Sequence, residues 1–250
     1  MITIKSKEEI GLMKEAGKVT AEILASLDGF IKPGMTTWEI DKYVEGEILR
    51  HGQLPAFKGY AGFPASVCAS VNEVVVHGIP SKKKILREGD IVSIDMGTVY
   101  KGYYSDAART YAVGTVSPEA AKLIETTKRS FFEGLKLARA GNRLSDISHA
   151  IQMTCEAEGY SMIRDYVGHG IGSKMHEDPQ IPNYGKAGHG PRLVPGMVLA
   201  IEPMVSMGTY EVEVLSDDWT ARTLDRSWTA HYENTVVITE DEPYLTTLLK

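Results

Sequence analysis

The chain has 250 residues, of which 43% are apolar and 24% are charged, and its formal net charge at pH 7 is −6. These values are those of an ordinary soluble globular protein, and the acidic balance argues against a direct, sequence-specific nucleic-acid contact. Two cysteines are too few for a disulfide framework, and neither a signal-peptide core nor an apolar run of the ~18 residues that span a bilayer is present. We therefore expect a cytoplasmic protein with reduced thiols and no membrane contact.

The predicted elements form two helix pairs, each followed by strands. Apolar residues at helical spacing, interrupted by KPGMTT and AGNRLSD, predict four helices, at residues 7–31, 38–52, 119–139 and 147–159. Strand-rich stretches follow each pair, at residues 65–77, 91–113, 197–214 and 228–239. Their connections are mostly short, which predicts antiparallel strands in an α+β domain.

The two halves align at a constant offset of 107 residues. Glycines match glycines along this alignment, at Gly34 and Gly141, Gly52 and Gly159, and Gly89 and Gly196. The segment LREGDIVSID (86–95) falls on LVPGMVLAIE (193–202), so that Asp95 falls on Glu202. We interpret the chain as a single catalytic domain (1–250) with an internal duplication, at approximately 7–113 and 114–240, and a pseudo-twofold arrangement.

Carboxylates occupy similar places in the predicted strands. Asp95 closes IVSID, Asp106 follows eleven residues later, Glu202 is the match of Asp95, and Glu233 lies in the last strand, HYENTVVITE. A hairpin turn centred between residues 100 and 101 would place Asp95 directly opposite Asp106. Four acids on one interior face would repel one another unless a divalent cation neutralised them. Oxygen donors suit Mg, Mn or Fe(II), and an added imidazole extends the choice to Co and Zn.

Three histidines stand in settings that suit chemistry. His169 lies between glycines in DYVGHGIG and is the candidate imidazole ligand. His77 in NEVVVHGIP and His176 in GSKMHEDPQIP precede turns, where a histidine can carry a proton near neutral pH. We predict surface or structural positions for the others, namely His51, His149, His189 and His231. No GxSxG, Walker, HExxH or GxGxxG motif occurs.

Five segments, in this order, resemble the type I methionine aminopeptidases of the pita-bread metallopeptidases: NEVVVHGIP, DMGTVYKGYYSD, GHGIGSKMHEDP, GMVLAIEP and YENTVVIT. The resemblance runs over roughly residues 5–245 and implies an α+β pita-bread fold, with an antiparallel sheet covered by two helix pairs. It implies a metal-dependent hydrolase that removes the N-terminal methionine from nascent peptides and proteins with a small second residue.

The resemblance also implies a dinuclear centre of Co, Mn, Fe, Zn or Ni, with five ligands: Asp95, Asp106, His169, Glu202 and Glu233. Asp106 and Glu233 would bridge the ions, and a metal-activated hydroxide would attack the scissile carbonyl. Glu202 would carry the proton to the leaving amine. His77 and His176 would stabilise the tetrahedral intermediate and position the peptide.

An apolar pocket for the methionine side chain is implied as well, lined by Tyr60, Phe63, Cys68, Met175 and Trp219 beside His77 and His176. This chain departs from better-known members at two positions. Phe57 stands where a cysteine is common, and Met175 stands where an aromatic residue is common. A monovalent cation site is implied at three further positions, Asn72, Val74 and Thr229.

By the same resemblance we expect a monomer that acts on N-terminal Met peptides and nascent chains, and a ribosomal contact stays open. One alternative is an Xaa-Pro aminopeptidase of the same fold, which would carry an additional N-terminal domain. A second is a non-catalytic pita-bread protein that binds partners and has lost ligands. A third is an unrelated Ca or Mg module, which would leave His77, His169 and His176 without a role.

Overall fold

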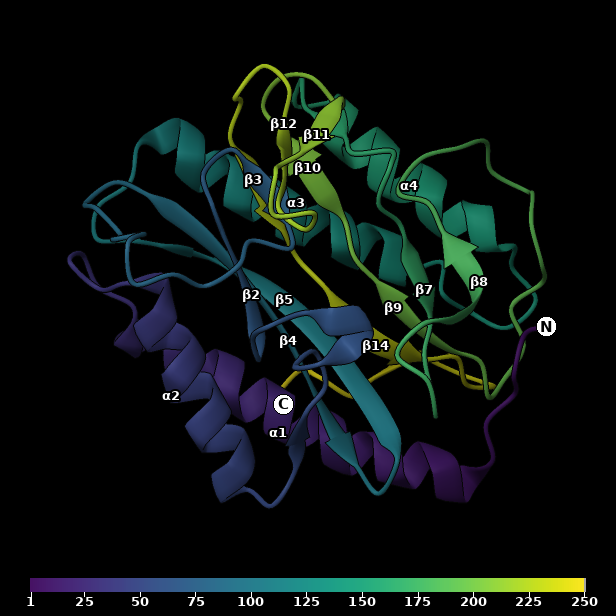
Figure 1. Ribbon diagram of the computed structural model, residues 1–250. Helices are drawn as coiled ribbons and strands as arrows, with labels where there is room; N and C mark the ends of the chain where they lie inside the picture. The colour runs from purple at the N-terminus through teal and green to yellow at the C-terminus, as the bar shows by residue number, and fades with distance from the viewer. Residues whose placement is uncertain (250) are drawn as a thin grey trace.

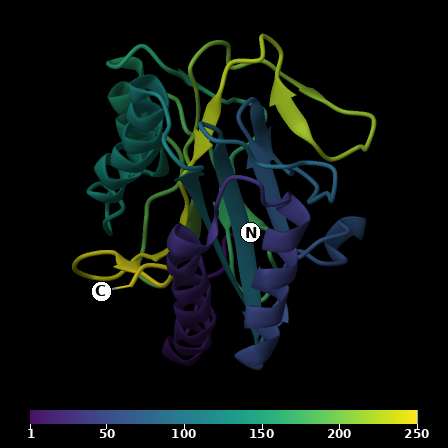
Figure 2. The same ribbon diagram turned by 90° about the vertical axis from the view of Figure 1, so that its left-hand side faces the viewer.

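The helices of the computed structural model, which describes residues 1–249, stand in two pairs over different parts of a strand layer (Figures 1 and 2). The helices are α1 (Lys7–Phe30), α2 (Thr37–Arg50), α3 (Pro118–Leu135) and α4 (Leu144–Glu156), with a 3-10 turn, η1, at Tyr60–Gly62. No helix within residues 1–249 is long and apolar enough to cross a membrane.

Most strands are short and two are long. They are β1 (Leu54–Pro55), β2 (Val67–Val71), β3 (Val74–Val76), β4 (Ile91–Tyr100), β5 (Tyr103–Ala112), β6 (Ser161–Met162), β7 (Gly168–Gly170), β8 (Glu177–Ile181), β9 (Val198–Ile201), β10 (Met204–Ser206), β11 (Val212–Val214), β12 (Ala221–Thr223), β13 (Thr229–His231), β14 (Asn234–Val237) and β15 (Tyr244–Leu245). The strand pairs recorded among residues 1–249 run antiparallel, as expected.

Local capping explains where the helices begin. Ser6 and Thr36 precede α1 and α2, and each side chain accepts a hydrogen bond from a backbone N–H three residues later, in a capping box closed by Glu9 or Glu39. Helix α4 begins three residues earlier than predicted because the Asp146 carboxylate accepts the Arg143 N–H at 2.7 Å and fixes the first turn there.

Hydrogen bonds at the base of each helix pair recur at the predicted offset. Leu86 N–H donates to the Met35 carbonyl and Leu193 N–H donates to the Asn142 carbonyl, both at 2.8 Å, and the partners are 107 residues apart. The isolated bridge between Thr36 and Ile85 likewise recurs between Arg143 and Arg192. These contacts support a duplication, and the boundaries 7–113 and 114–240 stay a prediction.

Each helix pair packs on its own half of the strand layer. Leu27 of α1 and Ile40 of α2 share a buried cluster with Ile94 of β4, whereas Phe131 of α3 and Ile147 of α4 belong to a cluster on the β9 side. One half contains the sheet β1-β4-β2 with β5 on β4, and the other contains β15-β14-β9-β7-β8. β5 and β14 lie side by side where the halves meet (Figure 1).

The β4–β5 hairpin differs from the predicted register. Its loop is Lys101-Gly102, with φ of 48° and 84°, and Tyr100 pairs with Tyr103. A two-residue loop with both φ values positive matches the twist of the strands, and glycine adopts that conformation readily. The prediction that Asp95 lies directly opposite Asp106 is therefore wrong, because Asp106 faces Gly97. Residues 95 and 97 share one face, so the two acids are diagonal neighbours.

The last predicted strand is interrupted. Residues 229–231 pair with β10 and residues 234–237 pair with β9, and the chain breaks its ladder at Tyr232 and Glu233. The Glu233 N–H donates instead to the Ala108 carbonyl of β5 at 2.9 Å. Glu233 thus stands at the join between the two halves.

Candidate metal centre

One cavity of about 200 Å³ is lined by every residue predicted to bind metal, take part in catalysis or bind substrate. These twelve residues come from segments far apart in the sequence and are Tyr60, Phe63, Cys68, His77, Asp95, Asp106, His169, Met175, His176, Glu202, Trp219 and Glu233. Phe57, Val76, Tyr166 and Val167 complete the wall. The structure thus brings the predicted set together, while the role of each residue stays a prediction.

The five predicted ligands come from both halves. Asp95 lies within β4, which continues to Tyr100 rather than ending at the acid, and Asp106 lies on β5. His169 is the central residue of β7, and Glu202 directly follows β9. Asp106, His169 and Glu233 are buried, with exposed fractions of 4%, 7% and 1%.

Burial and mutual repulsion make these carboxylates weak acids in the metal-free protein. Burial raises the pKa of Asp95 from 3.8 to about 7. The pKa values of Asp106, Glu202 and Glu233 are raised well above their ordinary range, first by burial and then by the neighbouring acids. Arg109 acts in the opposite direction on Glu233, so its charge offsets part of this repulsion.

His169 is oriented toward the acids by its own strand. Its Nδ1 lies 2.9 Å from the Gly170 carbonyl, and an N–H there directs the Nε2 lone pair into the cavity. Nε2 lies 3.7 Å from Asp106 Oδ2 and 3.5 Å from Glu202 Oε1, too far for a hydrogen bond. Burial lowers the pKa of His169 to about 3, so the ring is neutral and able to bind a metal ion.

Several buried atoms in this cluster have no hydrogen-bond partner among the described residues: Asp95 Oδ1, Asp106 Oδ1, Glu233 Oε1 and His231 Nε2. Unpaired buried carboxylate oxygens are costly, and a cation that they coordinate removes the cost. Two sets of side chains are close enough to hold an ion, and both contain Glu233: Asp106, His169 and Glu233, and Asp95, His231 and Glu233. The donor chemistry therefore fits divalent metal ions.

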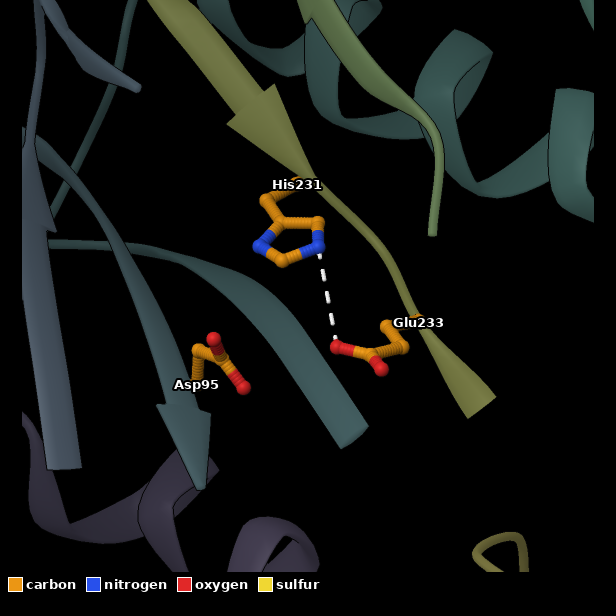
Figure 3. Close-up of side chains that lie close together, drawn as sticks. All are labelled: Asp95, His231 and Glu233. Atoms are coloured by element: carbon orange, nitrogen blue, oxygen red, sulfur yellow. Dashed lines mark ion pairs between the residues drawn. The ribbon is translucent and has the colours of Figure 1, made fainter. Parts of the chain in front are cut away.

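His231 is the one member of these sets that the sequence reasoning placed elsewhere. We predicted a surface or structural position, but His231 is 2% exposed and its ring faces Asp95 and Glu233 (Figure 3). Burial lowers its pKa to about 3. The available signal was its position two residues before Glu233, because alternate residues of a strand share a face.

The two candidate catalytic histidines lie at the mouth of the cluster. The Tyr60 hydroxyl lies 2.7 Å from His176 Nδ1, and the ring centroids of His176 and His169 are 4.2 Å apart. His77 directly follows β3 in a left-handed conformation, with φ of 59°, and its ring meets Tyr166 edge-on at 5.2 Å. Burial lowers the pKa of His77 to about 4. The sequence reasoning missed Tyr166, which precedes the GHG motif by two residues.

The remaining cavity wall is apolar. Phe63, buried beside Cys68, packs edge-on against Trp219 with ring centroids 5.1 Å apart. Burial raises the pKa of the Cys68 thiol well above its usual value, so this group stays protonated. Met175 is 1% exposed, and Phe57 packs on the same cluster. Both departures from the family pattern therefore keep the wall apolar.

The predicted monovalent-cation residues also meet. The Thr229 hydroxyl donates to the carbonyls of Val74 and Asn72, at 2.9 and 3.2 Å. Asn72 is held by its own side chain, which accepts the Ile91 N–H and donates to Asp90. The cation itself stays a prediction.

Comparison with known proteins agrees with this geometry. Residues 11–240 match metallopeptidase family M24, and the chain belongs to that family. It is 57% identical to the methionine aminopeptidase of Clostridium acetobutylicum over 99% of both chains. It superposes on the crystal structure of methionine aminopeptidase from Thermotoga maritima with a TM-score of 0.98 and 48% identity, covering 100% of both chains.

The fold extends beyond these enzymes. The prolidase of Pyrococcus horikoshii matches with a TM-score of 0.80 at 23% identity, and this chain covers 64% of it. That likeness concerns the fold alone. The fold prediction is thereby confirmed as a pita-bread α+β fold of helices and antiparallel strands.

Proposed function

We propose that Asp95, Asp106, His169, Glu202 and Glu233 hold a pair of divalent metal ions at which an N-terminal methionine is released from peptides. The activity follows from family membership and from full-length identity to curated methionine aminopeptidases, and it is the function of this chain. The observation that carries the proposed centre is the set of buried, unpartnered carboxylate oxygens around one cavity.

The centre would supply the hydrolytic chemistry. Divalent ions bound there polarise a carbonyl oxygen and make water a competent nucleophile near neutral pH. Glu202 is suited to move a proton toward the leaving amine, because burial raises its pKa well above the ordinary value of a glutamate. Glu202 lies within 3.7 Å of two imidazoles, so its carboxylate reaches both sides of the cluster.

His176 and His77 are suited to bind the carbonyl oxygen of the reacting peptide bond. A hydrogen bond between His176 Nδ1 and the Tyr60 hydroxyl fixes the ring and leaves Nε2 for the substrate. The left-handed backbone of His77, held between Tyr166 and Trp219, aims the second ring into the same cavity. Fixed donors at a site of developing negative charge stabilise the transition state.

The methionine side chain would enter the apolar part of the cavity. Phe63, Cys68, Met175 and Trp219 offer aromatic faces and sulfur atoms, which make favourable contacts with a thioether. A pocket of about 200 Å³ has room for one side chain of this size. We extend the proposal to a small second residue, to nascent chains as substrates and to a monomer acting in the cytoplasm.

The test uses metal-stripped protein with Met-Ala-Ser, Leu-Ala-Ser and Ala-Pro-Ala, each with and without Mn(II) or Co(II). Metal-dependent release of methionine from the first peptide alone is expected. Cleavage of Ala-Pro-Ala alone would move the function to the proline-directed enzymes of this fold. Binding of metal without any cleavage would favour a non-catalytic binding protein. As a control for the ligand set, Glu233→Gln should lose both metal loading and activity.

A further inference from the structure

His231 is a buried imidazole for which the five-ligand centre has no role. Its Nε2 has no hydrogen-bond partner among the described residues. It lies 3.7 Å from Glu202 Oε2 and 3.7 Å from Glu233 Oε2, outside hydrogen-bond distance on both sides. Figure 3 shows the ring and the carboxylates of Asp95 and Glu233 directed toward a common space.

These separations suit donors that share a metal ion. Two atoms that each bind an ion at about 2.1 Å can lie up to about 4.2 Å apart. His169 shows the same spacing, with Nε2 3.7 Å and 3.5 Å from its carboxylate neighbours. The two candidate sets are parallel in composition, since each contains one aspartate, one histidine and the shared Glu233.

The internal duplication supplies an independent reason for a ligand at this position. Asp106 pairs with Gly97 in the first half. Met204 is 107 residues after Gly97, and its partner across β10 and β13 is His231. The same register continues beyond the break, where Asn234 pairs with Ile201. His231 therefore occupies, in the second half, the place that Asp106 occupies in the first.

The backbone around both residues is fixed in the same way. The Thr110 hydroxyl accepts the His231 N–H and donates to the His231 carbonyl, both at 2.9 Å. The Thr235 hydroxyl accepts the Asp106 N–H at 3.0 Å and donates to its carbonyl at 2.8 Å. A threonine from the opposite half thus clamps each residue and sets where its side chain points.

We propose that His231 Nε2 is a sixth protein ligand, bound to the ion that Asp95 and Glu233 hold. Each of the two ions then has one imidazole, from His169 and from His231. This inference rests on the metal centre proposed above. A second nitrogen donor favours Co(II), Ni(II) or Zn(II) over Mn(II) at that position.

The decisive experiment counts coordinated imidazoles. In the Co(II)-loaded protein, each bound histidine gives a paramagnetically shifted, exchangeable ring N–H signal in the proton NMR spectrum. We expect two such signals, of which His231→Gln loses one and His169→Gln loses the other. Isothermal titration should show that His231→Gln weakens one of two Co(II) sites by more than tenfold. His189→Gln, which removes an exposed imidazole, should change neither result.

The spectrum separates a ligand from a hydrogen-bonding neighbour. Loss of a neighbour of the ligands can also weaken metal binding 10–100-fold, but it leaves the number of coordinated imidazoles unchanged. A single shifted signal in the unmutated protein, or two in folded His231→Gln, would overturn the inference and leave the five-ligand centre intact. Failure of the unmutated protein to bind Co(II) would instead remove the centre itself. The count in the unmutated protein does not depend on a variant folding.

Discussion

Replacing Asp95 with asparagine should stabilise the metal-free protein at alkaline pH and destabilise the metal-loaded one. The pKa of Asp95 is about 7 in the folded metal-free chain against 3.8 as its ordinary value. A raised pKa in the folded state contributes stability that is complete below pH ~3.8 and is lost as the pH rises through about 7. At pH 8 the ionised, buried carboxylate costs about 4 kcal/mol relative to the acid limit.

The assay is urea unfolding of metal-stripped protein and of Asp95→Asn between pH 5 and pH 8. The free-energy difference between them should shift in favour of the variant by about 3 kcal/mol over this range. Buried histidines with lowered pKa values, such as His77 and His231, titrate in both proteins and cancel in the difference. With Co(II) present the order should reverse, because the unmutated protein has the better site. A difference that does not change with pH would refute the reasoning.

Three further predictions concern catalysis, the pocket and the core. His77→Ala should lower kcat about a hundredfold while bound metal, measured by atomic emission after dialysis, stays unchanged; loss of metal would show that His77 supports the centre. Trp219→Ala should raise KM for Met-Ala-Ser more than it lowers kcat, and the opposite split would remove Trp219 from the pocket. Phe131→Ala should cost about 3–5 kcal/mol in urea unfolding, because Phe131 is fully buried against Tyr232; a cost below 1 kcal/mol would contradict that packing.

Features that depend on local chemistry could be predicted from the sequence. Glycine and the helix caps act over a few residues, so the four helices and the repeat offset are visible in the pattern itself. The cluster of acids followed from the same offset, since Asp95 falls on Glu202. Twelve candidate side chains then lie around one cavity, because the motifs that contain them end at the same strand edges.

Features that depend on pairing across strands could not be predicted with the same certainty. The β4–β5 register rests on Lys101 adopting a left-handed conformation, which a lysine seldom prefers, beside Gly102, which adopts it at little cost. The role of His231 depends on a break in the ladder at Glu233, which alternation alone does not reveal. In both places the deciding contact joins residues that are not neighbours in the sequence.

The pairing also explains why the two halves supply unequal donors. Asp95 and Asp106 project from β4 and β5, and the matching register in the second half contains Glu202, His231 and Glu233. The place that corresponds to Glu233 in the first half is Ala108, which is fully buried and gives its carbonyl to the Glu233 N–H. A carboxylate there would add a fifth negative charge to a cluster whose four acids already have raised pKa values. The small residue therefore lets the second half approach closely, and the imidazole of His231 adds a donor without adding charge.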